Sequence, residues 1–186
     1  MRLENTFEVA APVDAAWNLL NDVPNVLPCM PGAELVEVVS ESAWKARLHV
    51  KLGPISLQFL ADVSREEMDE QSGRVVLLTR AREAKGRGSA EARIESAMTA
   101  TEAGTKVDLF TDLELRGAVA QYGRGVVADV ASTLTRRFAD CLARKLADGA
   151  STPGEHSNAS APKPVNGFRV VIRALLQSLV KGIRRR

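Results

Sequence analysis

The first two thirds of the chain are dominated by segments in which apolar and polar residues alternate. The clearest is residues 44–52, WKARLHVKL, where every second residue is apolar and the intervening ones are basic or histidine. Comparable segments are residues 3–9, 55–63, 74–84, 86–100 and 106–115. A period of two indicates β-strands, and clean alternation is typical of an antiparallel sheet with one solvated face. Because the connections are short, we expect about six or seven strands joined by hairpins.

Two segments follow a helical period instead. A short helix is expected from Pro12 to about Leu20, ended by Asn21-Asp22 and followed by a proline-rich bend over residues 23–32. A long helix is expected over residues 118–147, where apolar residues recur every three or four positions. One long helix after an antiparallel sheet can cover only one of its faces, which predicts a two-layer α+β domain.

The interface between sheet and helix is expected to contain an apolar pocket. Small residues recur on both sides, and the chain has only eight aromatic residues to fill the space between the layers. Natural interiors are close-packed, so either the layers approach each other or a pocket remains, and we favour the pocket. Its predicted lining is Trp44, Leu48, Phe59, Ala90, Ala92, Met98, Leu109, Tyr122, Val126 and Val130, with Ser96 and Thr111 as polar groups. The alternative for each residue is a place in an ordinary packed core.

Six motifs across residues 7–123 carry a family resemblance. They are FEVAAPVDAAWNLLND at 7–22, CMPGAE at 29–34, KLGPISLQF at 51–59, KGRGSA at 85–90, GTKVDLFTDLELRG at 104–117 and AQYG at 120–123. The chain resembles the CoxG-type family of carbon monoxide dehydrogenase, within the START-like, SRPBCC helix-grip superfamily. The resemblance implies an antiparallel seven-stranded sheet wrapped on a long C-terminal helix. It also implies an accessory role beside a molybdenum hydroxylase of the carbon monoxide dehydrogenase type, tethering that enzyme to the membrane.

Charge is distributed unevenly along the chain. The whole sequence carries a net charge of +2, yet residues 1–162 hold 18 basic and 23 acidic groups while the last twenty-four residues hold seven basic ones and no acid. An acidic body with a cationic tail points to a polyanionic partner surface. We expect a domain at 1–148, a flexible linker at 149–166 and a cationic amphipathic helix at 167–186.

The predicted tail helix would lie in the bilayer interface. At about 100° per residue its apolar side chains fall within one arc of roughly 140°, opposite the cations. The membrane-binding residues are Phe168, Arg169, Val171, Ile172, Arg173, Leu175, Leu176, Leu179, Lys181, Ile183, Arg184, Arg185 and Arg186. The basic residues interrupt the apolar stretch, which argues against a membrane span. Docking on a partner protein or on the chain's own domain remains an alternative, while the continuous apolar arc disfavours nucleic acid.

The sequence offers no catalytic constellation. Its two histidines, His49 and His156, are both expected in solvent, no cluster has metal-ligand spacing, and GRGSAE at 86–91 lacks the setting of a phosphate loop. Cys29 and Cys141 fit two thiols in a reducing compartment, although the sequence leaves a disulfide open. Without an apolar leader at the N-terminus, we expect a cytoplasmic protein attached peripherally to the inner face of the membrane.

Two functions are consistent with these features. The first is a non-enzymatic tether that binds anionic lipids through its tail, the dehydrogenase through its body, and a hydrophobic small molecule in its pocket. The economical ligand is a respiratory quinone, menaquinone or ubiquinone, and no covalent cofactor or metal is expected. The second is a pure adaptor with a packed core and no ligand. A cyclase or hydrolase acting on a hydrophobic substrate is a weaker hypothesis, taken from the superfamily alone.

Overall fold

The computed structural model describes residues 1–52 and 55–150. The predicted linker from residue 151 onward and the predicted tail helix at 167–186 lie outside the described residues, as does His156. The elements are β1 (Arg2–Val9), α1 (Val13–Asn21), α2 (Val23–Val26), a 3₁₀ turn η1 (Leu27–Cys29), β2 (Ala33–Ser40), β3 (Ala43–Leu52), β4 (Ile55–Asp69), β5 (Arg74–Glu83), β6 (Gly88–Thr101), β7 (Gly104–Gly117), a second 3₁₀ turn η2 (Ala118–Tyr122) and α3 (Gly123–Ala150). Among these, no helix is long and apolar enough to cross a bilayer.

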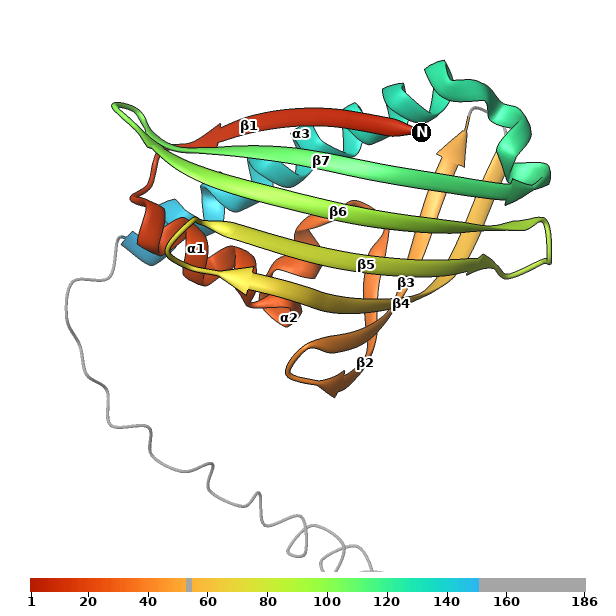
Figure 1. The fold of residues 1–186 in the computed structure, drawn as a ribbon, viewed down its shortest axis with the longest axis horizontal. Helices are drawn as coiled ribbons and strands as arrows, with labels where there is room; N and C mark the ends of the chain where they lie inside the picture. Colours follow the sequence, from red (N-terminus) through yellow and green to blue (C-terminus); the bar gives the residue numbers. More distant parts are fainter. Residues whose placement is uncertain (53–54, 151–186) are drawn as a thin grey trace, which may run out of the picture. The chain divides into compact units, whose positions relative to one another are not determined.

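All seven strands form one antiparallel sheet in the order β1-β7-β6-β5-β4-β3-β2. Six strands follow each other as hairpins, and β1 closes the order by pairing with the last strand. Figure 1 shows α3 running along one face of this sheet, while β3 and β4 turn away from the direction of β5–β7. The predicted helix-grip architecture, a seven-stranded antiparallel sheet wrapped on a long C-terminal helix, is confirmed.

Local sequence chemistry explains where the helices differ from prediction. The segment 23–32, expected as an irregular bend, holds the short helix α2 and the turn η1, with a proline in the first turn of each. The long helix begins at Gly123 rather than at 118, because Gly117 and Gly123 both have positive φ and enclose a separate 3₁₀ turn. It continues through Ala150, past the predicted domain end at 148.

Strand β2 had no prediction of its own because its apolar residues do not alternate. The pairing with β3 shifts register between Leu35 and Glu37 and again between Val38 and Ser40. Each bulge adds a residue and reverses the face of those that follow. Val36, Val38 and Val39 are consequently about half exposed in a strand at the sheet edge.

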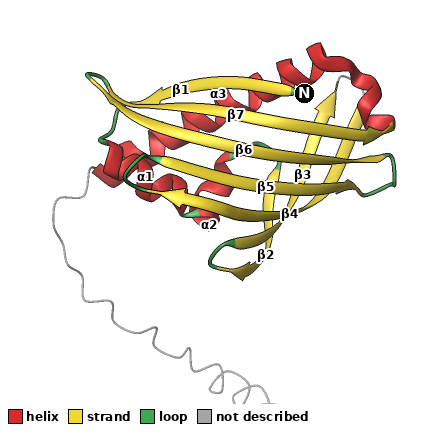
Figure 2. Cartoon of the chain, viewed as in Figure 1, coloured by secondary structure: helices red, strands yellow, loops and turns green. Residues whose placement is uncertain are grey.

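The helices all lie on one face of the sheet (Figure 2), and two apolar clusters form beneath them. The larger cluster joins α1, η1 and the later part of α3 to one end of the sheet, with Trp17, Cys29, Val107 and Leu142 buried. In it, the rings of Phe7 and Phe138 meet edge to face at 6.2 Å. The second cluster lies at the other end and contains Leu57, Phe59, Ala61, Ala81 and Val119.

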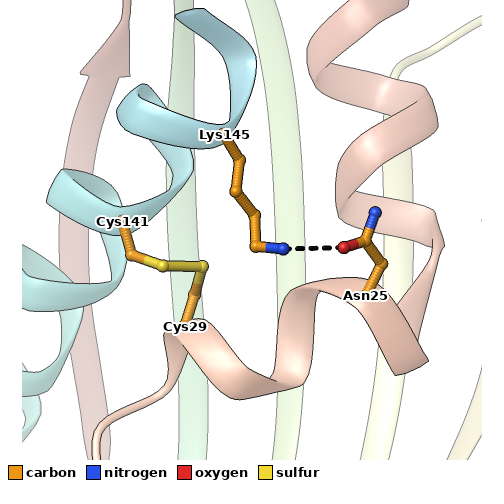
Figure 3. The surroundings of a disulfide bond; sticks show 4 residues. All are labelled: Asn25, Cys29, Cys141 and Lys145. Carbon is orange, nitrogen blue, oxygen red and sulfur yellow. Dashed lines mark hydrogen bonds between the residues drawn. A yellow bond between two sulfur atoms is a disulfide. The ribbon is translucent and has the colours of Figure 1, made fainter. Parts of the chain in front are cut away.

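A disulfide between Cys29 and Cys141 joins η1 to α3 across 112 residues of chain, with a Cα–Cα distance of 5.4 Å (Figure 3). One turn further along the helix, the Lys145 ammonium donates a hydrogen bond of 2.7 Å to Oδ1 of Asn25. The sequence left open whether these cysteines are thiols or a disulfide, and the structure pairs them. Cysteine spacing could not decide this, because the two residues become neighbours only when the helix folds back over the bend.

A hollow between helix α3 and strand β3

A hollow of about 880 Å³ lies where α3, the end of β3 and the turn after η1 meet. Its lining is Tyr122 at the end of η2, then Val126, Asp129, Val130, Thr133, Leu134 and Arg137 from α3, and the facing wall is Pro31, Gly32, His49, Val50 and Lys51. The space exists because β2 pairs with β3 only as far as Leu48, which faces Ala33. The last residues of β3 therefore have no neighbouring strand on that edge within the described chain, and the helix passes beside them.

The interior between the two core clusters is incompletely covered. Ala92, Ile94 and Leu113 belong to the helix-facing side of the sheet by their register, yet each is only half-buried. On the helix, Val126 is 44% exposed although it lies in the apolar row that faces the hollow. A volume of this size with an apolar wall falls within the range of small-molecule sites.

The structure divides the ten predicted lining residues among several environments. Tyr122, Val126 and Val130 line the hollow. Phe59 belongs to the second core cluster and Met98 to the larger one, with both buried. The remaining placements are Trp44 buried in β3, Leu48 and Ala90 packed against the second cluster, Leu109 packed against the larger one, and Ala92 half-buried between them.

Four small residues form a row across the sheet. Ala46, Ala61, Ala81 and Ala90 face one another across four neighbouring strands. The opposite side of the sheet at this row holds a second hollow of about 550 Å³, whose wall includes charged side chains such as Lys45, Asp62, Arg80 and Glu91.

Several polar residues at the hollow were not predicted as site residues. His49 was expected to be in solvent, and it is exposed, but it also borders the hollow beside Lys51. Asp129, Thr133 and Arg137 follow each other at intervals of four along α3. Residues four apart lie on the same side of a helix, so this spacing places the three polar residues beside the apolar row Val126, Val130 and Leu134. It was the available sequence signal that they border the hollow. The apolar positions of the helix, taken alone, do not reveal it.

A buried carboxylate fixes the wall of the second cluster. Glu83 has a fully buried side chain; its Oε2 accepts hydrogen bonds from the backbone N–H groups of Lys85 and Arg87 at 2.8 and 3.1 Å. The Arg87 guanidinium donates to Oε1 at 2.7 Å and to the Ser56 carbonyl at 2.9 Å. The ion pair with Arg87, supported by these backbone donors, lowers the pKa of Glu83 to about 2.

Gly88 of the KGRGSA motif and Gly117, which ends the LELRG segment, are required by the backbone in the same part of the fold. Gly88 and Gly117 pair across β6 and β7, and both have positive φ. A Cβ on Gly88 would overlap the carbonyl oxygen of Arg116 and crowd Val119. The motif therefore marks a close approach of two strands and the η2 turn.

Within the described residues, no group of three or more His, Cys, Asp or Glu side chains is arranged to hold a metal ion. The chemistry available at the hollow is that of an apolar wall bordered by polar side chains of both charges, among them Asp129 and Arg137.

Solved structures with this fold come from several bacteria. A conserved protein from Geobacillus kaustophilus is 20% identical, with a TM-score of 0.71, and the match covers 80% of this chain and 97% of that one. The ZhuI aromatase/cyclase from Streptomyces sp. R1128 is 17% identical, with a TM-score of 0.61 and coverage of 83% and 98%. A START superfamily protein from Mycobacterium smegmatis is 15% identical, with a TM-score of 0.53 and coverage of 79% and 97%. At these identities the likeness shows the fold alone.

Comparison with curated proteins gives no match. The family model for the CoxG subunit of carbon monoxide dehydrogenase matches residues 6–147, which include the second half of β1, strands β2 to β7, α1, the disulfide and nearly all of α3. The match includes every motif that carried the resemblance. This chain belongs to the CoxG family of carbon monoxide dehydrogenase subunits.

Proposed function

We propose that this chain is a non-enzymatic accessory protein of a molybdenum enzyme of the carbon monoxide dehydrogenase type. It binds a lipophilic ligand, a respiratory quinone such as menaquinone or ubiquinone, in the hollow beside α3. Residues 167–186 attach it peripherally to anionic lipids on the inner face of the cytoplasmic membrane. The observation that carries the ligand proposal is the 880 Å³ hollow with its apolar row of helix residues, in a chain of this family.

The ligand proposal also has support from the incomplete interior. The two core clusters are each well buried, so the half-buried residues between them are not explained by a generally loose fold. Apolar surface left accessible in this way lowers stability by roughly 25 cal/mol for each Å². A bound apolar molecule would recover that free energy, which favours a binding protein over a pure adaptor with a packed core.

The ligand is tested by extracting the full-length protein, purified from its native host, with organic solvent and identifying the lipids by mass spectrometry. A stoichiometric quinone is expected from the wild type. The variant Val130→Trp, which places an indole in the hollow, should lose it, whereas Ser132→Trp, at an exposed position of α3 outside the hollow, should retain it. Wild-type protein without any co-purified lipophile would favour the pure adaptor.

The membrane proposal is tested separately with vesicles. Full-length protein should sediment with phosphatidylcholine vesicles containing about 30% phosphatidylglycerol, and less so as salt is raised, since each basic residue near the surface contributes up to about 1 kcal/mol. Replacing Arg169, Arg173 and Lys181 together with glutamate should abolish sedimentation. Replacing Arg136 and Arg144, which are exposed on α3, should not. Equal sedimentation of both variants would contradict attachment through the tail.

The same tail variant tests the accessory role in the host. Dehydrogenase activity should move from the membrane fraction to the soluble fraction when the three tail cations are replaced. It should stay with the membrane when Arg136 and Arg144 are replaced. If dehydrogenase activity stays in the membrane fraction with both variants, the enzyme is attached to the membrane by another route. Because the structures of this fold include an aromatase/cyclase, an enzymatic role is the alternative to test. The protein is incubated with the extracted lipid, and a modified product would support that alternative.

A further inference from the structure

One end of the domain is basic, although the rest of the domain is acidic. The end of β3 with the start of β4, the turn from β5 to β6, and η2 with the start of α3 meet there (Figure 1). Over residues 51–56, 82–88 and 114–124 the chain has six basic and two acidic residues, whereas the remainder of residues 1–150 has 12 basic and 20 acidic ones. The cations of this basic end are Lys51, Arg82, Lys85, Arg87, Arg116 and Arg124. A local excess of positive charge on an acidic body attracts an anionic partner surface.

Backbone contacts join the parts of the basic end. The Arg87 guanidinium donates a hydrogen bond of 2.9 Å to the carbonyl of Ser56, which pairs with Lys51 across β4 and β3. The Arg87 carbonyl accepts a hydrogen bond of 3.3 Å from a backbone N–H of η2. Arg82 and Arg116 face the same residue of β6 from its two sides. Cations that are far apart in the sequence therefore belong to one surface.

Most of these cations are available to a partner. The exposed ones are Lys51, Arg82, Lys85, Arg116 and Arg124, and Arg87 is half-buried. Within residues 1–52 and 55–150, only two of the six, Arg87 and Arg116, form an ion pair with a glutamate. The other four have no carboxylate partner in this part of the chain, so carboxylates of another molecule can approach them without displacing a native ion pair.

The character of the surface favours a protein partner over a bilayer. Among the residues of the basic end whose side chains the structure describes, Ile55 is the one large apolar residue that is exposed, at 36%. Binding in a membrane interface needs a wider apolar face that enters the lipid. Four of the six cations are arginines, and a guanidinium binds a carboxylate through two parallel hydrogen bonds.

The position of the basic end agrees with this choice. Helix α3 begins there and runs for 28 residues to Ala150, a length of about 42 Å (Figure 1). The chain therefore continues toward the proposed lipid-binding residues from the opposite end of the domain, and the basic end carries no such connection. Lys51 and Tyr122 belong to the basic end and also line the hollow.

We infer that the basic end is the surface on which the partner enzyme docks, through a patch of that enzyme rich in aspartate and glutamate. This inference rests on the proposed accessory function. It adds the face of the domain that meets the enzyme and the chemistry of the counterpart. Because two residues of this surface line the hollow, a docked enzyme lies next to the proposed ligand site.

The test measures association of the full-length protein with the carbon monoxide dehydrogenase purified from the same host, by biolayer interferometry. Lys85→Glu/Arg124→Glu should slow association about tenfold at about 50 mM salt, and much less at about 300 mM, because salt screens the steering by charge. Arg136→Glu/Arg144→Glu changes the net charge equally at exposed positions of α3 outside the basic end, and it should associate at close to the wild-type rate. Equal slowing by both variants, or by neither, would overturn the inference.

Cross-linking of the wild type tests the same surface without substitutions. A carbodiimide joins lysine amines directly to carboxylates, so Lys51 or Lys85 should be found linked to aspartate or glutamate of the enzyme. Cross-links confined to Lys106 or Lys145, which lie at the start of β7 and in the last turns of α3, would contradict docking at the basic end.

Two controls separate this inference from the alternatives. Lys85→Glu/Arg124→Glu should sediment with the phosphatidylglycerol vesicles as the wild type does, and a loss of sedimentation would assign the basic end to lipid instead. Wild-type protein that binds the vesicles but not the enzyme would refute the accessory function, and the docking surface with it. Wild-type binding that neither the variant nor the cross-links trace to the basic end would refute the docking surface alone.

Discussion

Breaking the Cys29–Cys141 disulfide should destabilise the protein without unfolding it. The bond closes a loop of 112 residues, and chain entropy for a loop of this length corresponds to about 5 kcal/mol, with measured values for native disulfides of about 2–5 kcal/mol. Other contacts hold the same elements together: Leu142 is buried in the larger core cluster, and Lys145 donates a hydrogen bond to Asn25. We expect them to persist when the bond is reduced. The loss therefore falls on the unfolded state, which gains conformational freedom.

The measurement is urea unfolding followed by tryptophan fluorescence, with and without a phosphine reductant. For an m-value of about 2 kcal/mol/M, the midpoint should fall by about 1 to 2.5 M on reduction. The double variant Cys29→Ser/Cys141→Ser should match the reduced wild type and show no further response to reductant. Superimposable oxidised and reduced curves, or two reactive thiols counted in native protein purified without reductant, would refute the reasoning. The thiol count also bears on location, because structural disulfides are rare in reducing compartments.

Three further predictions concern the fold around the site. Leu142→Ala should lower the free energy of unfolding by about 2–5 kcal/mol in the same assay, because the side chain is 1% exposed and α3 is fixed by the disulfide, so the cavity cannot collapse. Smaller loss would show that α3 moves to fill it. Glu83 has a pKa lowered to about 2, so its contribution is complete above its unfolded pKa of about 4.3 and is lost as the pH falls toward 2. Wild type should therefore lose more stability than Glu83→Gln between about pH 5 and pH 2, and parallel curves would contradict the ion pair. Gly88→Ala should lower the melting temperature more than Gly86→Ala, because both residues have positive φ but only Gly88 has no room for a Cβ; equal shifts would mean that backbone strain alone matters.

The candidate site could be predicted only in part. Tyr122, Val126 and Val130 are predicted for the pocket because they recur every four positions in the helix expected at 118–147, and all three line the hollow, with Tyr122 in η2. Trp44, Phe59 and Met98 have the same apolar alternation but are buried in the sheet instead. Alternation states which face a residue is on. It does not state whether the helix covers that part of the face, so core and cavity residues look alike along the chain.

The rim was missed for a related reason. Arg137 and His49 are ordinary exposed charged and polar residues in sequence, eighty-eight positions apart. They come to line one hollow only when α3, held to η1 by the disulfide, passes beside the end of β3, and this contact has no local signal. Glu83 was equally hidden, since its burial depends on Arg87 and two backbone donors in the following turn.

The sequence by itself determined the architecture. Period-two alternation required an antiparallel sheet with one wet face, the helical period after residue 117 required a covering helix, and the motifs from Phe7 to Gly123 placed both in a family. Tertiary structure alone decided the rest. It ended the pairing of β2 with β3 at Leu48 and joined Cys29 to Cys141, and it left a hollow where α3 passes beside the end of β3. The physical reason is that local periodicity sets the face of each side chain, whereas a cavity depends on where distant elements stop touching.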